Sequence, residues 1–198
     1  MATTAQPPSL PQRPPVPKLK RAVWLAMVAM SVFFLVLAYA DLERHGLAGA
    51  AYRSDWLTPP LAAMLSANTA VLVASSLALR RARQYLRLRR LRACLRWLAT
   101  AFALGLGFLA GQAIAWRSLL AAGVYVAAQP NSAFFYLITA AHAAHLLVAL
   151  ALLGWLLTRA WRGRLQPDRP LLMDLTAILW HFLDATWVYL YVVLLYWR

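Results

Sequence analysis

The chain has 198 residues, of which 63% are hydrophobic and only 13% are charged. Soluble domains carry about 25% charged residues, so this composition excludes an ordinary soluble domain and indicates a membrane protein. The net charge of +14 does not predict nucleic-acid binding, because the basic residues lie between apolar segments and form no continuous basic face. The single cysteine, Cys94, excludes an internal disulfide and a cysteine-based metal cluster.

The N-terminal segment, residues 1–20, is rich in proline. Because proline has no backbone N–H and clashes in a helix interior, we expect a disordered or polyproline II tail here, separate from a membrane domain at residues 21–198. The apolar segment that follows is too long for the core of a secretory signal, and no small-residue cleavage motif comes soon after it. The prolines of the tail are Pro7, Pro8, Pro11, Pro14, Pro15 and Pro17.

Five apolar windows follow the tail, and each is long enough to cross a bilayer as a helix. A span needs about 20 apolar residues, because a helix rises about 1.5 Å per residue across about 30 Å of hydrocarbon. Helices are required because lipid gives the backbone no hydrogen-bond partners and the windows lack the alternation of barrel strands. We therefore predict an all-α membrane protein, a bundle of five transmembrane helices, with spans at about 22–40, 56–79, 95–116, 133–158 and 171–197.

The basic residues alternate between the two sides of these spans. Of the 20 lysines and arginines, 16 lie in the tail and in the loops after the second and fourth spans, and four lie on the opposite side. Basic residues accumulate on the cytoplasmic side of a membrane. We therefore predict a cytoplasmic N-terminus and, after an odd number of spans, a C-terminus outside.

The loop after the second span carries eight arginines between positions 80 and 96, with Leu88, Leu91 and Leu95 at helical spacing among them. One interpretation is a short helix in the membrane interface, whose arginines contact anionic lipid headgroups. The other is that the arginines act only as a topology signal. The first interpretation predicts lipid contacts at Arg81, Arg87 and Arg90.

Ionisable residues inside the spans are concentrated in the last two. His142 and His145 lie three residues apart in the fourth span, as do His181 and Asp184 in the fifth, so each pair shares a helix face. His145 lies about 20 Å and His181 about 15 Å from the inner end of its span, so they would meet near mid-membrane if these helices were neighbours. Three interpretations remain open: a haem held by two histidines, a proton path, and a hydrogen-bonded clamp between helices.

Two further features of the spans are expected from structure alone. The cluster of Gly105, Gly107 and Gly111 in the third span indicates close helix packing rather than the broken helix of a transporter, and no inverted repeat divides five spans into halves. Tryptophans at span ends are typical of the aromatic belts that line both membrane interfaces. These are Trp24, Trp56, Trp116 and Trp197.

Four strings of residues in the spans fit a recognisable pattern. The fourth span reads FFYLITAAHAAHLLVAL, an aromatic pair leading to Thr139 and then to His-x-x-His. The fifth reads LWHFLDATWVYLYVVLLYW, with Trp-His-Phe-x-Asp followed by x-x-Trp. The second contains Asn68 and Thr69 before paired serines, and the third contains Gln112. In this order they resemble subunit III of the haem–copper cytochrome c oxidases, in its five-helix bacterial form, over nearly all of residues 22–198.

The resemblance implies a non-catalytic subunit of a terminal oxidase, placed in the bacterial inner membrane. Members of this family carry no haem or copper of their own, since these lie in partner subunits. They pack against the catalytic subunit I in a complex that also holds subunit II, bind phospholipid, and support proton uptake and the lifetime of the active site. On this basis we expect no catalytic residue, no metal ligand and no nucleic-acid partner.

The same resemblance predicts contacts for the polar and aromatic residues of the spans. The histidines and Asp184 are expected to fasten the last two helices together, and two deep tryptophans are expected to contact lipid or subunit I. The residues expected to make interhelical or lipid contacts are His142, His145, His181, Asp184, Trp180, Trp187, Asn68 and Gln112.

Two positions depart from the family pattern. The family has a buried glutamate at the place of Met30 or an immediate neighbour, and often a second at the place of Ala115, three residues after Gln112. The loss of both acids indicates a divergent member and weakens any proton-related role. A subunit III-like accessory protein of a nitric oxide reductase is the alternative, followed by a small b-type haem protein or a transporter.

Overall fold

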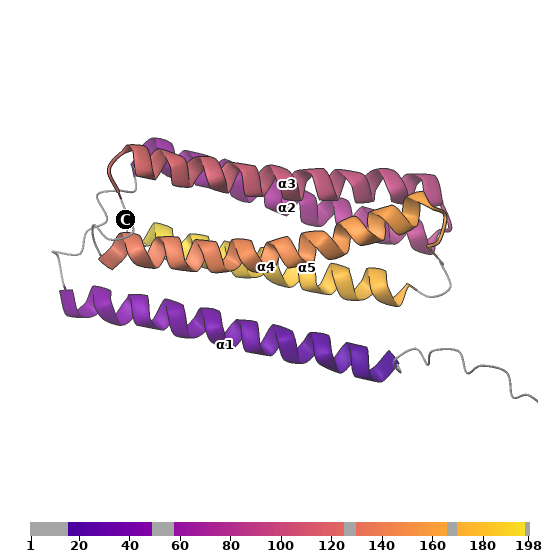
Figure 1. The fold of residues 1–198 in the computed structure, drawn as a ribbon, viewed down its shortest axis with the longest axis horizontal. Helices are drawn as coiled ribbons and strands as arrows, with labels where there is room; N and C mark the ends of the chain where they lie inside the picture. The colour runs from indigo at the N-terminus through magenta and orange to yellow at the C-terminus, as the bar shows by residue number, and fades with distance from the viewer. Residues whose placement is uncertain (1–15, 49–57, 125–129, 166–169, 197–198) are drawn as a thin grey trace, which may run out of the picture.

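The computed structural model describes residues 16–48, 58–124, 130–165 and 170–196, and these ranges form long helices joined by turns (Figure 1). Each of the five helices contains a window long and apolar enough to cross a membrane. The prediction of an all-α protein with five spans is therefore confirmed within the described ranges. The helices are α1 (Val16–Ala48), α2 (Pro59–Arg87), α3 (Leu91–Ala121), α4 (Pro130–Trp161) and α5 (Leu171–Tyr196).

Most of the helices extend beyond the predicted spans. One example is α3, which covers Leu91–Ala121 where the sequence predicts about 95–116. At the other end of the chain, α1 begins at Val16 and so includes Pro17, which the sequence analysis places in a non-helical tail. Proline is tolerated in the first turn of a helix because the N–H groups there have no partner within the helix. Residues 1–15 and Trp56 lie outside the described residues.

A tight turn, Leu88–Arg90, joins α2 to α3 at the position of the predicted interfacial helix. The Leu88 N–H donates to the Gln84 carbonyl, and the Arg90 N–H donates to the Tyr85 carbonyl at 2.9 Å, which closes the last turn of α2. Arg89 has a φ of 57°, in the left-handed region that ends many helices. The interfacial-helix interpretation is therefore wrong, because the arginines lie mainly on the adjoining ends of two long helices.

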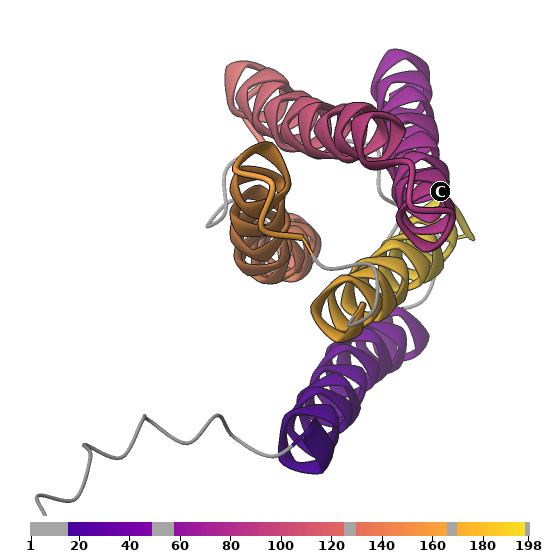
Figure 2. The same ribbon diagram turned by 90° about the vertical axis from the view of Figure 1, so that its right-hand side faces the viewer.

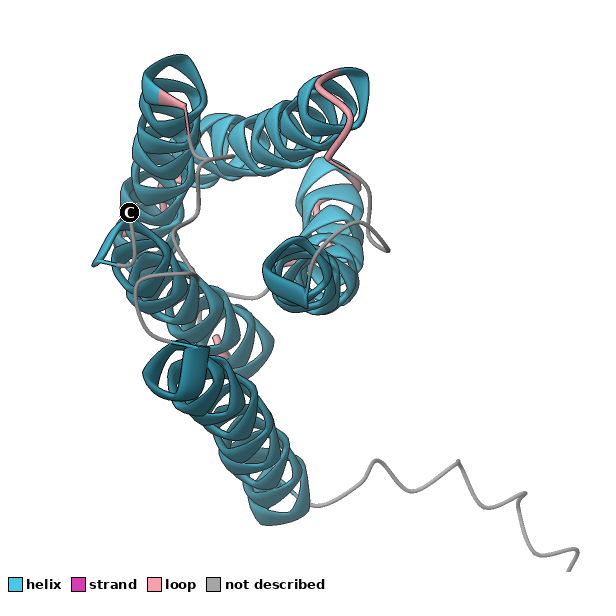
Figure 3. Cartoon of the chain, turned by 90° about the vertical axis from the view of Figure 1, so that its left-hand side faces the viewer, coloured by secondary structure: helices cyan, strands magenta, loops and turns pink. Residues whose placement is uncertain are grey.

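Helices α2, α3, α4 and α5 pack around one core, and α1 lies outside this group. The α2–α3 hairpin is flanked by α5, which packs on α2, and by α4, which packs on α3; α4 and α5 also contact each other and close the ring. Figure 2 shows this arrangement from one end of the bundle, with α1 against α5. Figure 3 shows the same arrangement from the opposite end.

The centre of the core lies between α2 and α5. Leu72, Leu79 and Leu86 of α2 are seven residues apart and fully buried. Trp180 and Trp187 of α5 show the same spacing, are 0% exposed, and belong to the same cluster of buried side chains. A seven-residue apolar repeat keeps one face of a helix turned towards its neighbour, which explains why these two helices pack along their length.

By contrast, α1 buries only a narrow stripe of its described surface. Met27, Phe34 and Ala38 are buried, and Phe34 packs with Ile138 of α4 and Leu190 of α5. The opposite surface is apolar and exposed, as expected for a helix that contacts lipid or another membrane helix. Its exposed large side chains are Trp24, Leu25, Val28, Val32, Phe33, Leu35, Val36 and Tyr39.

Candidate functional site

Polar side-chain pairs join α2 to α5 along most of their length, and we call the following four pairs the polar ladder. Two pair hydroxyl groups with aromatic partners, one pairs a hydroxyl with a histidine, and one is an ion pair. Because the two helices run in opposite directions, the pairs occur in reverse order along α5. They are Ser66 with Tyr191, Thr69 with Trp187, Ser76 with His181, and Arg83 with Asp174.

The spacing of this polar ladder on α2 follows from helix geometry. Its four α2 residues are three, seven and seven positions apart, so they lie along one face of the helix. The Trp187 indole N–H donates to the Thr69 hydroxyl at 3.0 Å. Such a hydrogen bond between membrane helices contributes on average about 0.6 kcal/mol. Each pair of the polar ladder stabilises the packing of α5 on α2 only slightly. Together the four pairs fix the position of α5 along α2, because each polar group has a partner at matching height.

His181 is the central ionisable residue of this ladder. Its Nδ1 shares a hydrogen bond with the Ser76 hydroxyl at 2.8 Å, and Ser76 itself is buried. The Asp184 carboxylate, one turn further along α5, interacts with both Ser76 and His181. His181 and Asp184 thus attach α5 to α2, whereas the sequence analysis has them attach α5 to α4. The predicted partner helix was wrong. Helix α5 packs against both α2 and α4, and the face that carries His181 is turned towards α2.

His142 lies in an aromatic cage at the junction of four helices. Its ring is 0% exposed and lies 5.1 Å from the Trp187 ring, 6.2 Å from Phe108 and 6.1 Å from Phe34, measured between centroids. These rings come from α5, α3 and α1, so His142 of α4 contacts all three neighbouring helices. His142 is one of the four residues expected to fasten α4 to α5, and it contacts α5 through the Trp187 ring.

His145 lies next to His142 on α4, and both rings pack on Phe34 of α1. Its Nδ1 interacts with the Ala141 carbonyl one turn earlier at 2.7 Å, and its ring packs on Phe33 and Phe34 of α1. His145 and His181 therefore do not meet, because one faces α1 and the other faces α2. The haem interpretation required two histidines on facing helices, and these two do not have that arrangement. Within the described ranges, no group of three or more His, Cys, Asp or Glu residues is placed to hold a metal ion.

The interface of α3 with α4 contains a second group of polar side chains. Trp116, assigned by the sequence analysis to an aromatic belt, donates its indole N–H to the buried Thr139 hydroxyl at 3.1 Å. Gln112 lies one turn before Trp116 and is 1% exposed. Among the described residues, neither the Gln112 amide nor the His142 ring nitrogens have a hydrogen-bond partner. A buried polar group without a partner costs about 1–3 kcal/mol, so this interface contributes less stability than its packing suggests.

Asn68 and Gly111 hold α2 close to α3. The Asn68 amide donates to the Phe108 carbonyl at 3.1 Å, a contact that needs close approach of the two backbones. Gly111 allows it, because a Cβ at this position would collide with the Asn68 amide. Ser75 makes a similar bond to the Ala101 carbonyl at 2.9 Å. Asn68 thus makes an interhelical contact, and close packing is found at Gly105 and Gly111 of the glycine cluster but not at Gly107.

The two deep tryptophans of α5 make interhelical contacts. Trp180 and Trp187 are both 0% exposed and lie inside the four-helix core. The sequence analysis expects them to contact lipid or subunit I, and in this bundle neither ring is on the outer surface. A seven-residue stripe of apolar side chains fits a core face and a lipid face equally well, because both surroundings are apolar.

The positions without the expected acids are filled by apolar contacts. Ala115 is 0% exposed and packs with Leu119 and Phe135 between α3 and α4. Met30 is half-buried and packs against the main core. Ala115 is thus enclosed by apolar side chains, whereas Met30 is only partly covered.

The arginines expected to contact lipid occupy different environments. Arg87 lies 3.5 Å from Asp174, which also pairs with Arg83. Arg90 is exposed at the end of the tight turn, and Arg81 lines a surface pocket between α2 and α3. The Arg83–Asp174 ion pair itself was missed by the sequence analysis, although an antiparallel alignment of the two helices in register would have identified it.

Comparison with known proteins points to one family. A sequence model of the family described as cytochrome c oxidase subunit III matches residues 56–198. A probable cytochrome c oxidase subunit 3 of Mycobacterium tuberculosis is 30% identical over 103 residues, which is 52% of this chain and 51% of that protein. A cytochrome c oxidase subunit 3 of Cyprinus carpio is 27% identical over 194 residues, which is 93% of this chain and 72% of that protein.

A third relative shows the same limited overlap as the mycobacterial protein. The cytochrome c oxidase subunit 3 of Corynebacterium diphtheriae is 27% identical over 99 residues, which is 50% of this chain and 48% of that protein. The chain thus spans about half the length of the bacterial relatives that it matches, and most of the fish protein. At such low identities the similarity is that of a distant relative.

Proposed function

Because the chain belongs to the cytochrome c oxidase subunit III family as a divergent member, we propose that it is a non-catalytic subunit of a haem–copper terminal oxidase. In this proposal it packs on subunit I, in a complex that includes subunit II, and binds phospholipid. It would support proton uptake and the lifetime of the active site, while the haem and copper lie in the partner subunits.

The observation that carries this proposal is the position of the family match. Residues 56–198 include α2 to α5, the helices that form the ring and contain the polar ladder. The polar side chains of the ladder are engaged in fastening helices to one another, as expected of a supporting subunit. The apolar exposed surface of α1 offers a contact for another membrane helix, in agreement with a place inside a larger complex.

The experiment that tests the proposal is co-purification in mild detergent from a bacterial host that carries the native complex. We expect an affinity-tagged chain to bring down subunits I and II of a haem–copper oxidase. Recovery of a nitric oxide reductase instead would support the alternative family role and contradict the main one. A Soret absorption band in the chain purified alone would contradict the assignment to a cofactor-free subunit.

The same experiment tests the roles of His181, which belongs to the polar ladder, and of its neighbour Asp184. We expect His181→Ala and Asp184→Ala to lower the recovered complex, or its sustained turnover, by at least about threefold, which corresponds to about 0.6 kcal/mol of interhelical contact. Thr186→Ala is the matched control on α5, because the Thr186 hydroxyl bonds only to the Phe182 carbonyl of its own helix. If both ladder variants behave like this control, the ladder has no role in assembly.

We further propose that the chain lies in the bacterial inner membrane with its N-terminus in the cytoplasm. The alternation of basic residues supports this orientation, and the proline-rich tail at residues 1–20 would then be cytoplasmic. In a Cys94→Ala background, we expect Gly123→Cys to react with an impermeant thiol reagent added outside, and Arg90→Cys not to react. Both positions lie in exposed turns at opposite ends of α3, and the reverse labelling pattern would overturn the orientation.

Met30 and Ala115 stand where the family has glutamates, and both are packed among apolar side chains. Any influence on proton uptake would therefore act through contacts with subunit I, and not through these two positions.

A further inference from the structure

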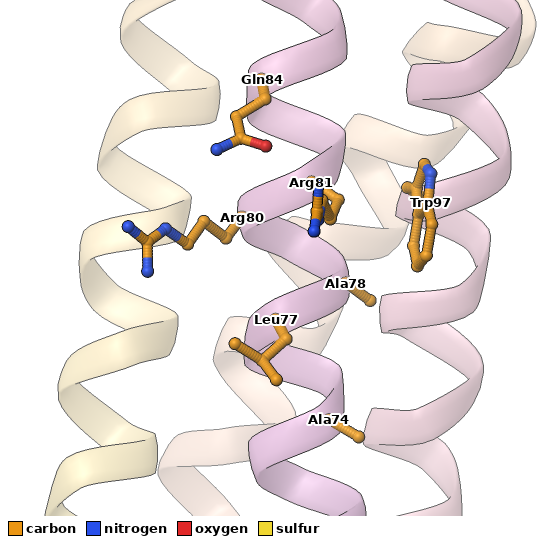
Figure 4. A pocket seen from close by; sticks show the side chains of 7 residues that line it. All are labelled: Ala74, Leu77, Ala78, Arg80, Arg81, Gln84 and Trp97. Carbon is orange, nitrogen blue, oxygen red and sulfur yellow. The ribbon is translucent and has the colours of Figure 1, made fainter.

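A pocket of about 480 Å³ lies on the surface of α2 and α3, towards the arginine-rich end of the hairpin. Arg80, Arg81 and Gln84 of α2 form its polar half, and all three are exposed (Figure 4). Trp97 of α3 lies across from Arg81 at the same height along the bundle. Two guanidinium groups and an amide offer several hydrogen-bond donors to a phosphate, and guanidinium is the side chain best matched to that group.

The other half of the pocket is apolar and lies nearer the middle of α2. Ala74 and Ala78 are four residues apart on the side of α2 that faces α3, and the Leu77 side chain, 57% exposed, lies beside them (Figure 4). From Ala74 to Gln84 the helix rises about 15 Å. The pocket therefore changes from apolar to basic along the direction in which a lipid changes from acyl chain to headgroup.

Among the described residues, no carboxylate neutralises the charge of this pocket. Asp174 is occupied by Arg83 and Arg87, which lie on a neighbouring face of α2. In the part of the chain that the structure describes, no carboxylate pairs with Arg80 or Arg81. The two guanidinium groups are therefore free to bind an anion from outside the chain.

We propose that this pocket binds an anionic phospholipid of the leaflet on the arginine-rich side. Arg80 and Arg81 hold its phosphate, Trp97 lies at the boundary of headgroup and chain, and the acyl chain runs over Ala74 and Leu77. The proposal deepens the proposed function, because it rests on phospholipid being a ligand of this subunit. It also narrows the lipid contacts expected from the sequence to Arg81 and adds Arg80.

Tryptophan quenching in the full-length chain, purified in detergent, tests this proposal. Phosphatidylglycerol with brominated acyl chains is titrated in, since bromine quenches nearby tryptophans. We expect a saturable part of the quenching to disappear in the Trp97→Phe variant. In an Arg80→Gln/Arg81→Gln variant we expect the half-saturating lipid concentration for that part to rise on the order of tenfold, because interfacial arginines contribute strongly to binding anionic lipid.

Two further variants separate pocket binding from general charge attraction. Arg92→Gln/Arg96→Gln removes the same charge from exposed α3 residues that do not line the pocket, and we expect a shift of less than about twofold. Ala74→Leu fills the apolar half without a change in charge, at an exposed position, and we expect it to weaken lipid binding. Equal shifts in the two arginine pairs would overturn the proposal.

Competition with inorganic phosphate separates the lipid from a free anion. We expect millimolar phosphate at constant ionic strength to leave the lipid bound, because it uses only the polar half of the pocket. Displacement of the lipid by phosphate, together with no effect of Ala74→Leu, would show a site for free phosphate and overturn the lipid assignment. None of these measurements involves a catalytic subunit, so the proposed function stands or falls on co-purification alone.

Discussion

Replacing Gly105 with alanine is expected to destabilise the four-helix core by about 1–3 kcal/mol, the usual effect of overpacking. A Cβ at this position would lie 2.7 Å from Cη2 of Trp180 and 2.9 Å from Cδ1 of Leu150, well inside the distance of about 3.5–4.0 Å at which carbon atoms pack. The Trp180 ring is 0% exposed and is surrounded by other core residues, so it has no free space into which to move.

Cys94 provides a direct readout of this change. It is the single cysteine of the chain and is 1% exposed in the first turns of α3, so a thiol-reactive fluorophore reports the opening of the bundle on heating. We expect the midpoint of labelling for Gly105→Ala to fall by about 2–12 °C, at about 2–4 °C per kcal/mol for a chain of this size.

Gly107 is the matched control for Gly105, because it lies two residues away in the same helix. The nearest atom to a Cβ at Gly107 is Cγ1 of Val71 at 3.8 Å, an ordinary contact. We expect Gly107→Ala to leave the midpoint unchanged or to raise it slightly, since alanine favours helix over glycine. Adding Trp180→Phe to Gly105→Ala removes the colliding ring atoms but not the contact with Leu150, so we expect the double variant to lose less stability than the sum of the two single variants. Equal effects at Gly105 and Gly107 would contradict the close packing described here.

Trp187→Ala is expected to have the largest effect of any single change on stability, about 3–5 kcal/mol. Trp187 contacts every helix of the ring: its indole N–H bonds to Thr69 of α2, and its ring lies 5.0 Å from Phe108 of α3 and 5.1 Å from His142 of α4. Removal of the ring leaves a cavity at the point where these helices meet, and the loss is mainly one of van der Waals packing because lipid is as apolar as the core.

A graded series at this position separates packing from hydrogen bonding. Trp187→Phe keeps most of the ring volume but loses the bond to Thr69, and we expect it to cost about 1 kcal/mol or less. Trp161→Ala is the control, because Trp161 is 79% exposed at the end of α4. The Cys94 labelling assay should show the order Trp187→Ala, Trp187→Phe, Trp161→Ala, from most to least destabilised. A loss for Trp187→Ala no greater than that of the control would contradict its central place in the core.

The glycine and histidine positions show how far spacing along one helix predicts contacts. The glycine cluster correctly predicted close packing at Gly105 and Gly111, because a residue without a side chain lets a neighbouring helix come closer. Helical spacing was less informative for His142 and His145. Three residues separate two side chains by about 60° around the helix axis, which is enough for His142 to reach Trp187 in the core while His145 packs on α1; both rings still contact Phe34.

The two tryptophans of α5 show a second limit that is specific to membranes. In water, an apolar stripe on a helix predicts a buried face, because exposure of that stripe would be unfavourable. In a bilayer, the stripe formed by Trp180 and Trp187 is as compatible with lipid as with a protein core. Only the packing of α2, α3 and α4 around α5 shows that these rings are inside.

The number of helices and their approximate limits could be predicted from the sequence alone, because hydropathy and the demand of the backbone for hydrogen bonds act within each segment. Only the tertiary structure decided which helices are neighbours and therefore which polar residues meet. Ser76 and His181 lie 105 residues apart in the chain and bond at 2.8 Å because α2 and α5 pack antiparallel in register. Hydropathy shows which faces carry polar residues but not which helix each face meets, so the polar contacts that define the register appear only when the helices are assembled.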